Sequence, residues 1–319
     1  MSPATHEHIA RRIRLPERTR ALLATTYMWC ASPIGHWWVE RIVQTGLPEW
    51  FRVPLHYLFS HRVSPDDQRV ECQVEAMRTH FARRPEAYRL ASASVAGENK
   101  LRTADWLAYR SSVPQYWGTF LLLCANACRA RTILELGSCI GISGCYLAAG
   151  RHCRTFITLE GSAALASIAA SHIRQIRPQG VVINAPFDRG LDMVLPMLSD
   201  GIDLAYIDGS HQKALTLNYF HRLIPYLRTG SLVVFDDILW SSEMWQAWQE
   251  LCQWHGITYT INVGRFGICG WDSAALKPKH HDLAKLVGWW RIGTPALRAQ
   301  YFPRWVRQSQ CMPSDTEEV

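Results

Sequence analysis

The residues best suited to chemistry in this 319-residue chain are acids that directly follow short apolar runs. Asp208 follows the run LAYI, the pair Asp236 and Asp237 follows SLVVF, and Glu160 follows RTFITL. If these runs are parallel strands of one sheet, their carboxyl ends share an edge, where ligands bind in open α/β sheets. We therefore expect an acidic site along that edge.

Three of these carboxylates repel one another if they meet, and a bound cation is the usual remedy. Oxygen ligands from short acids favour a hard ion, which means Mg²⁺ or else Mn²⁺ or Ca²⁺. The sequence thus predicts a metal site with Asp208, Asp236 and Asp237 as ligands. The alternative is that Asp208 alone faces the site and the other two cap the following helix.

His211 comes three residues after Asp208, in the loop that follows the strand. An imidazole there is well placed to take a proton from a hydroxyl group, and a nearby metal ion would make that hydroxyl more acidic. We predict His211 and Asp208 as the catalytic residues. A single histidine is more often structural, so that role stays open as well.

A glycine-rich stretch, RTILELGSCIGISGCYLAAG at residues 131–150, forms the other half of the predicted site. It predicts a buried strand at 132–136, a turn with Gly137 and Gly141, and a helix that stops at Gly150. Glycines let the backbone approach a ligand closely. A strand, glycine turn and helix in this order are typical of the nucleotide-binding corner of a doubly wound sheet.

The glycine spacing discriminates between nucleotides. The dinucleotide fingerprint requires a glycine where this chain has Cys139, and the Gly-Lys-Ser/Thr of a P-loop is missing. The pattern from Glu135 to Gly141 resembles the first motif of class I S-adenosylmethionine-dependent methyltransferases. That cofactor carries an ammonium group, which suits Glu135, and two ribose hydroxyls, which suit Glu160 at the end of the next strand.

The remaining elements alternate along the chain. Strands are predicted at 132–136, 154–159, 181–184, 204–207 and 231–235, helices at 163–177, 214–227 and 242–254, and a hairpin at 257–261 and 265–270. This order predicts an α/β, Rossmann-like doubly wound sheet, mainly parallel with a C-terminal antiparallel hairpin strand. Residues 1–120 are predicted as a helical N-terminal extension that caps the acceptor pocket, 121–275 as the cofactor-binding domain, and 276–319 as a basic tail with a disordered end.

The runs ILELGSCIGISGCYLA, TLEG, YIDGSH and FDDILW together resemble class I methyltransferases of the O-methyltransferase type, over roughly residues 130–272. The resemblance implies S-adenosylmethionine as cofactor, with Phe187 and Asp188 near its adenine, and Mg²⁺ as an assisting ion. The cofactor residues that it implies are Glu135, Gly137, Gly141, Glu160, Asp188 and Asp208. Catechol-type relatives carry Asp-Asn where this chain has Asp236 and Asp237.

The leading hypothesis is therefore methylation of a small-molecule hydroxyl group. RNA or protein is an alternative acceptor, which the net charge of +7 permits although no RNA-binding module is recognisable. A non-catalytic nucleotide-binding subunit is disfavoured by the intact acids, and a dinucleotide oxidoreductase by Cys139. Trp240, Trp245 and Trp248 can line an aromatic pocket, but a helix that packs its tryptophans into the core is the favoured account.

Ten scattered cysteines without a C-x-x-C pair favour reduced thiols and a cytoplasmic location. Residues 21–38 contain no Lys, Arg, Asp or Glu, but a proline, a glycine and a histidine interrupt them, so no transmembrane span is predicted. Trp29, Trp37 and Trp38 beside an arginine cluster leave a weak peripheral membrane contact open. Nucleic acid is not favoured as a partner.

Overall fold

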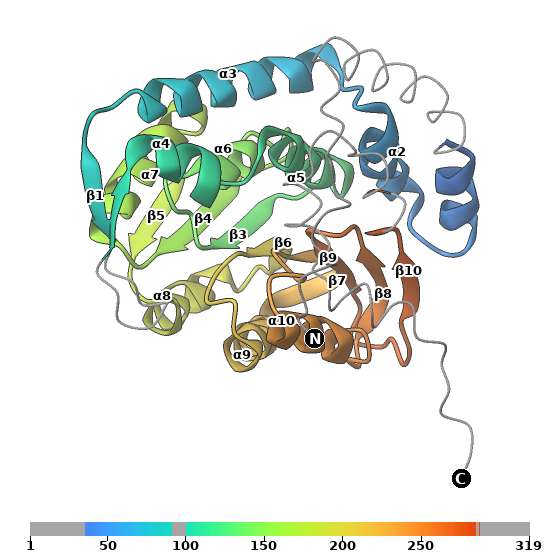
Figure 1. Ribbon diagram of the computed structural model, residues 1–319. Coiled ribbons are helices and arrows are strands. Elements are labelled where there is room, and N and C mark those ends of the chain that lie inside the picture. Colours follow the sequence, from blue (N-terminus) through green and yellow to red (C-terminus); the bar gives the residue numbers. More distant parts are fainter. Residues whose placement is uncertain (1–35, 91–99, 285–286, 288–319) are drawn as a thin grey trace, which may run out of the picture.

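A mainly parallel sheet organises the computed structural model, which describes residues 36–90, 100–284 and 287 (Figure 1). Its strands are β3 (Thr132–Leu136), β4 (Thr155–Glu160), β5 (Val181–Asn184), β6 (Ile202–Ile207), β7 (Leu227–Phe235), β8 (Ile257–Asn262), β9 (Gly267–Trp271) and β10 (Lys279–Asp282). Their order in space is β10-β8-β9-β7-β6-β3-β4-β5. From β3, the chain adds β4 and β5 on one side of the sheet and then β6 and β7 on the other side. The point between β3 and β6, where the strand order reverses, is the switch point at which such sheets bind ligands.

The pairing confirms the predicted sheet. β3 to β7 pair in parallel, and β9 runs antiparallel to both β7 and β8. β10 pairs in parallel with β8 and forms an edge strand that was not predicted. It lies within residues 276–319, for which the sequence predicted only a tail.

Helices cover both faces of the sheet (Figure 1). One face carries α5 (Gln115–Ala127), α6 (Ile142–Ala148) and α7 (Ala163–Ile176), and the other carries α8 (Phe187–Val194), α9 (Lys213–Leu223) and α10 (Ser242–Leu251). Successive strand residues point to opposite faces. In β6, Leu204 and Tyr206 therefore enter the core beneath α5, whereas Ala205 and Ile207 enter the core beneath α9.

The described part of the N-terminal extension is largely helical, as predicted. Residues 36–44 are helical, and α2 (Arg52–Ser60) and α3 (Pro65–Ala82) follow. A two-stranded hairpin of β1 (Ala87–Leu90) and β2 (Lys100–Thr103) was not predicted. It leads through the short α4 (Ala104–Trp106) into a π-helical turn at Leu107–Ser111.

Carboxylates attach α3 to the helices beneath it. The helix begins after Ser64, whose hydroxyl accepts the N–H of Asp67, and it forms an outer layer above α5 and α6 (Figure 1). Asp67, Glu71 and Glu75 recur every four residues and so lie on one face. They accept hydrogen bonds from Asn126 at 2.9 Å, Thr119 at 2.6 Å and Tyr146 at 2.9 Å, respectively.

Arg78, on the same helix, fixes the segment that leads towards the sheet edge. Its buried guanidinium donates to the carbonyl oxygens of Ala108 at 2.6 Å and Val113 at 2.7 Å. The π-helical turn between them ends at Ser111, whose hydroxyl lies 3.4 Å from the Cys139 thiol. The extension therefore reaches the glycine turn that the sequence analysis singled out.

Several predictions about the ends of the chain fall outside the described residues. Among them are the arginine cluster of residues 11–20, Trp29 and the tail from residue 288 onwards. Trp37 and Trp38 are described and exposed, and their membrane contact stays a prediction. No helix within the described ranges is both long enough and apolar enough to cross a membrane. The cysteines in those ranges are all free thiols.

Candidate functional site

The glycine turn after β3 requires its two predicted glycines. Gly137 has φ +96°, and a β-carbon there would lie 1.8 Å from the carbonyl oxygen of Asp208. Gly141 has φ +86°, and its β-carbon would lie 2.8 Å from the Cα atom of Ala169 in α7. Only glycine therefore allows the loops after β3 and β6 to touch and α7 to approach the turn.

Glu160 lies beside this turn, at the end of β4. Its Oε2 atom accepts the N–H of Cys139 at 2.8 Å, and Oε1 accepts the N–H of Ser162 at 2.8 Å. Burial raises the pKa of Glu160, and these backbone hydrogen bonds oppose the rise. Each carboxylate oxygen keeps a second lone pair. Glu160 can therefore still accept hydrogen bonds from ligand hydroxyls.

Glu135 is a fully buried carboxyl group in β3, against the first turn of α6. Neither of its oxygens has a hydrogen-bond partner of normal geometry. Burial raises its pKa to about 7, and the nearby hydroxyls of Ser143 and Thr158 lower it in part. Buried polar groups without partners are costly. The ammonium group of a ligand would supply the missing donors.

The turn as a whole fits S-adenosylmethionine. The hydroxyl of Ser138 is buried within the turn and also lacks a partner. Glu135 and Ser138, which precede and follow Gly137 in the chain, thus both have buried polar atoms with unmet hydrogen-bonding capacity at this turn. A buried carboxyl and a buried hydroxyl with unmet hydrogen-bonding capacity, in a tight glycine turn, suit a ligand with an amino-acid end.

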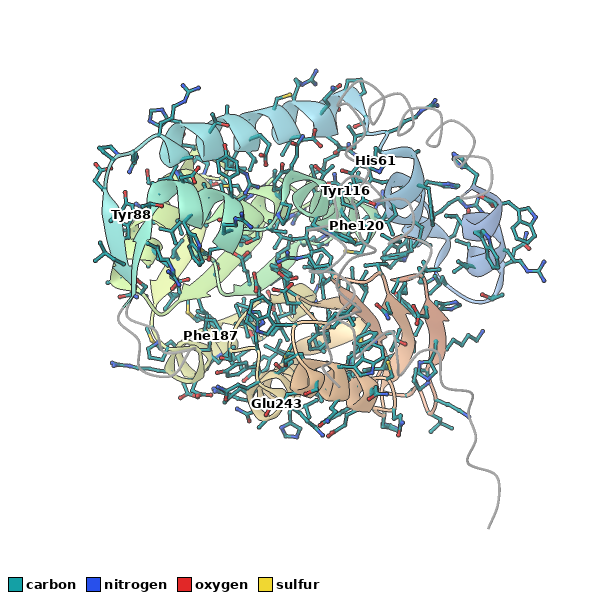
Figure 2. All side chains as sticks on the ribbon, viewed as in Figure 1. His61, Tyr88, Tyr116, Phe120, Phe187 and Glu243 are labelled. Carbon is teal, nitrogen blue, oxygen red and sulfur yellow. The ribbon has the colours of Figure 1, made fainter. Side chains whose placement is uncertain are left out.

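The segment after β5 places Phe187 and Asp188 differently. The Phe187 ring, at the start of α8 (labelled in Figure 2), would touch a β-carbon at Gly137 at 3.5 Å, and it packs edge-on against Tyr219. Asp188 is exposed and forms an ion pair with Arg222 of α9 at 3.1 Å. The structure thus brings Phe187 to the turn and engages Asp188 elsewhere. The cofactor role of Asp188 stays a prediction.

The acids after β6 and β7 come together as predicted, around Asp236. This carboxylate is 1% exposed and accepts three hydrogen bonds. The donors are the Tyr206 hydroxyl at 2.7 Å, the Asp237 N–H at 2.7 Å and the Arg265 guanidinium at 2.5 Å. The Tyr206 hydroxyl also lies 3.4 Å from Asp208 Oδ2, and Arg265 lies 3.6 Å from Asp237 Oδ1.

The charges of this cluster are strongly coupled. Burial raises the pKa of Asp208 well above its ordinary value, and repulsion from Asp236 and Asp237 adds to the rise. Burial also raises the pKa of Asp237, whereas Arg265 opposes that rise. Burial lowers the pKa of Arg265, but the carboxylates outweigh burial and raise it well above its ordinary value. A guanidinium therefore supplies positive charge at these acids.

The residues present do not fit the predicted Mg²⁺ site. Both oxygens of Asp236 already accept hydrogen bonds, and one of them is bound to a cation. Across residues 36–90, 100–284 and 287, no group of three or more His, Cys, Asp and Glu side chains is arranged to hold a metal ion.

His211 lies beside the acids, in a loop with unusual backbone geometry. Ser210, His211 and Asp237 have φ of 65°, 40° and 49°, in the left-handed region that non-glycine residues seldom adopt. The His211 ring lies 5.4 Å from the Trp240 ring, and its Nδ1 atom is buried without a partner. His211 also acts on the pKa of Asp237, which it lowers. The imidazole is thus held against an aromatic ring near a carboxylate.

The three tryptophans after the acid pair have different environments. Trp248 is buried in the core and Trp245 is partly buried, as the core interpretation expected. Trp240 is 62% exposed. Because it stacks near His211, it offers a flat apolar surface at the edge of the site.

Sequence reasoning missed two residues of the acid cluster, Tyr206 and Arg265. Tyr206 stands two positions before Asp208, so the alternation of a strand places both on one face. The place of Arg265 follows from the pairing of the hairpin with β7. Arg265 stands two residues before Gly267 of β9, and Gly267 pairs with Phe235 at the end of β7. An antiparallel neighbour of β7 must begin where β7 ends, and Arg265 therefore lies next to Asp236.

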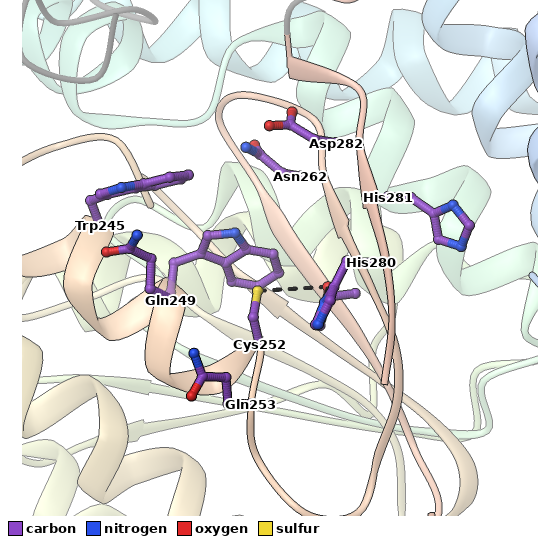
Figure 3. Close-up of a pocket in the computed structure, with 10 residues that line it drawn as sticks. Trp245, Gln249, Cys252, Gln253, Asn262, His280, His281 and Asp282 are labelled. Carbon is purple, nitrogen blue, oxygen red and sulfur yellow. Dashed lines mark hydrogen bonds between the residues drawn. The ribbon is translucent and has the colours of Figure 1, made fainter. Parts of the chain in front are cut away.

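A pocket of about 320 Å³ lies between α10 and the outer strands (Figure 3). Trp245, Cys252, Thr260, Asn262 and His280 are among its lining residues. Ile261 enters the core beneath α5, so its neighbours in β8 face α10. Tyr206, which binds Asp236, lies in the α5 core. The pocket and the acids are therefore on opposite faces of the sheet.

The segment that builds the site is similar to known proteins. Residues 134–238 match the protein family described as "Methyltransferase domain". Two curated relatives are named catechol O-methyltransferase. The one from Mycobacterium tuberculosis is 31% identical over 41% of this chain and 58% of its own length. The one from Niastella koreensis is 30% identical over 46% of this chain and 66% of its own length.

Among solved structures, an O-methyltransferase from Bacillus cereus aligns with a TM-score of 0.46 at 19% identity, over 69% of this chain and 96% of the other. This chain spans less than two thirds of the length of each of the two curated relatives. The matched residues run from β3 through the glycine turn to the acid pair after β7. The part of the chain that builds the site therefore matches the methyltransferase-domain family.

Proposed function

We propose that this protein is an S-adenosylmethionine-dependent methyltransferase that methylates a hydroxyl group of a small molecule. The observation that carries the proposal is the buried carboxyl of Glu135, whose oxygens lack hydrogen-bond partners of normal geometry, at the glycine turn of a segment that matches a methyltransferase domain. The names of the two curated relatives support a hydroxyl acceptor.

On the cofactor side, the residues of the turn bind and orient. Glu135 and Ser138 receive the amino-acid end, and Glu160 receives the ribose hydroxyls. Gly137 and Gly141 allow the turn to pack closely against the loop after β6 and against α7. The Phe187 ring lies over the turn. The cofactor supplies a methyl group on a sulfonium. Fixing that group against a bound acceptor accounts for much of the barrier reduction in such transfers.

On the acceptor side, His211 would take the hydroxyl proton, which would prepare the oxygen to receive the methyl group that a bound cofactor supplies. Asp237 lies close enough to His211 for the histidine to lower the pKa of its carboxyl group, so this carboxylate is the acidic neighbour of the proposed base. Trp240 provides a stacking surface for a planar acceptor. We therefore expect phenolic hydroxyls to be better acceptors than aliphatic ones.

Calorimetric titration with S-adenosylhomocysteine tests the proposal directly. We expect one site per chain with a dissociation constant in the micromolar range. The Gly137→Ala variant should not bind, because its β-carbon would meet the Asp208 carbonyl oxygen at 1.8 Å. Gly161→Ala is the matched control, since no atom lies within 4 Å of the added carbon. An absence of binding by the unmodified protein would overturn the proposed function.

The hydroxyl acceptor needs a second assay, in which a panel of catechols, simple phenols and sugars is mixed with the cofactor. Formation of S-adenosylhomocysteine reports transfer to each compound. Preferential turnover of phenolic compounds is the expected result. Turnover of RNA or a protein substrate, with none for the small molecules, would replace this acceptor class by the alternative.

A further inference from the structure

We propose that the guanidinium of Arg265 is the fixed cation of the acceptor site and occupies the place that the sequence predicted for a divalent metal ion. The part that concerns the acceptor rests on the proposed function. The part that concerns the acids does not, because it predicts how these carboxylates respond to added metal.

The hairpin holds Arg265 in place from two directions. The Arg265 side chain binds Asp236, and the Arg265 backbone carbonyl oxygen accepts the N–H of Ile238 at 3.2 Å. Ile238 directly follows the acid pair, so the hairpin and the loop after β7 are tied together on both sides of Asp236. The register of β9 on β7 supports the same placement, since Gly267 pairs with Phe235.

The guanidinium is surrounded by acids and almost withdrawn from water. Arg265 is 7% exposed, and its Nη2 atom lies 2.5 Å from Asp236 and 3.6 Å from Asp237. A planar guanidinium with several donors suits a buried contact of this kind. A divalent ion at the same carboxylates would have to displace Arg265 or lie beside a like charge in a poorly solvated place.

The guanidinium of Arg265 has N–H donors that its carboxylate contacts do not use. A guanidinium has five N–H donors, and the Nε atom of Arg265 is buried without a partner. In the proposed reaction, the acceptor hydroxyl gives its proton to His211, the oxygen forms a bond to the methyl carbon, and the electron pair of the broken bond stays on sulfur. Negative charge that develops on the acceptor oxygen is then opposed by a cation built into the protein. Arg265 thus acts through its charge, and its contacts with Asp236 and Asp237 also hold these two acids in place.

Manganese binding followed by electron paramagnetic resonance tests this role on the full chain, without any need for methyl transfer. We expect the unmodified protein to bind no Mn²⁺ at the acids. In Arg265→Gln the carboxylates lose their cation, and we expect Mn²⁺ affinity to rise by about tenfold or more. Arg228→Gln is the matched control. Arg228 also pairs with an acid, Asp203 at 3.0 Å, but this pair lies at the amino ends of β6 and β7, whereas Asp208 and Asp236 follow their carboxyl ends.

The outcomes separate this inference from the proposed function. One Mn²⁺ bound by the unmodified protein and lost in Asp208→Asn would overturn the inference, whatever the cofactor result. If Arg265→Gln does not fold, the titration of the unmodified protein decides alone. Methyl transfer that survives a chelator supports the inference. Transfer that stops in chelator and resumes with Mn²⁺ refutes it and leaves the proposed methyltransferase activity intact.

Discussion

Glu135 makes the stability of the ligand-free protein depend on pH in a predictable direction. Its carboxyl group is fully buried, and burial raises its pKa from 4.5 to about 7, although the hydroxyls of Ser143 and Thr158 oppose part of the rise. Between these values the native state holds a proton on Glu135 that the unfolded chain has lost. The free energy of unfolding must therefore fall as the pH rises through this window.

The size of the effect follows from the shift. A change from 4.5 to about 7 corresponds to roughly 3 kcal/mol between the charged and neutral forms. Most of that lies between about pH 5 and pH 8, over which the Glu135 contribution should fall by about 2.5 kcal/mol. Glu135→Gln cannot ionise and should lack this contribution, while it keeps the shape of the side chain.

Urea unfolding of the ligand-free protein and of Glu135→Gln, at several pH values between those limits, measures this contribution. Asp208, Asp237 and Glu160 also have raised pKa values, and the difference between the two proteins cancels their effect. The variant should gain stability relative to the unmodified protein as the pH rises. Parallel stability curves would show that Glu135 is not a desolvated carboxyl, and the argument for an ammonium partner would fail with it.

Three further predictions concern the same edge of the sheet. Gly137→Ala should lower the free energy of unfolding by more than the roughly 1–2 kcal/mol of a left-handed residue, because the loop after β6 must also move; Gly161→Ala should leave urea midpoints unchanged. His211→Ala should reduce kcat by about 10²–10⁴-fold without weakening S-adenosylhomocysteine binding in calorimetry, and an unchanged kcat would exclude it as the base. Glu160→Gln places an amide donor opposite a backbone N–H. We therefore expect the free energy of unfolding in urea to fall by about 1–3 kcal/mol and cofactor binding to weaken. If neither quantity changes, the hydrogen bonds of Glu160 to the turn are not as described.

The sheet was predictable because its strands are apolar runs that end at acids or turn residues. Two of the elements that were not predicted, α8 and β10, lack such a signal. α8 begins after Pro186 and contains Gly190, so its local propensity resembles that of a loop. β10 has the sequence KHHD, which is polar throughout, and its pairing with β8 depends on the edge that the hairpin leaves available.

The site was predictable only as far as single strands position it. Asp208, Asp236 and Asp237 were expected to meet because each follows a parallel strand. The partner that neutralises them comes from the hairpin beyond α10, and the register of β9 on β7 decides where it lies. Hydropathy and spacing cannot show that a guanidinium, rather than an ion from solution, fills such a position. The burial of Glu135 likewise depends on how α6 packs over β3.

The left-handed residues in the loops after β6 and β7 have a consequence for engineering. Ser210, His211 and Asp237 each hold a backbone conformation that costs a side-chain-bearing residue about 1 kcal/mol and costs glycine almost nothing. A screen for thermal stability alone would therefore favour glycine at these positions. The variants that it selects would be more stable and would lose the imidazole and a carboxylate of the proposed reaction. Stabilising changes are better sought on the outer face of α3. Its residues belong to neither the loop after β6 nor the loop after β7.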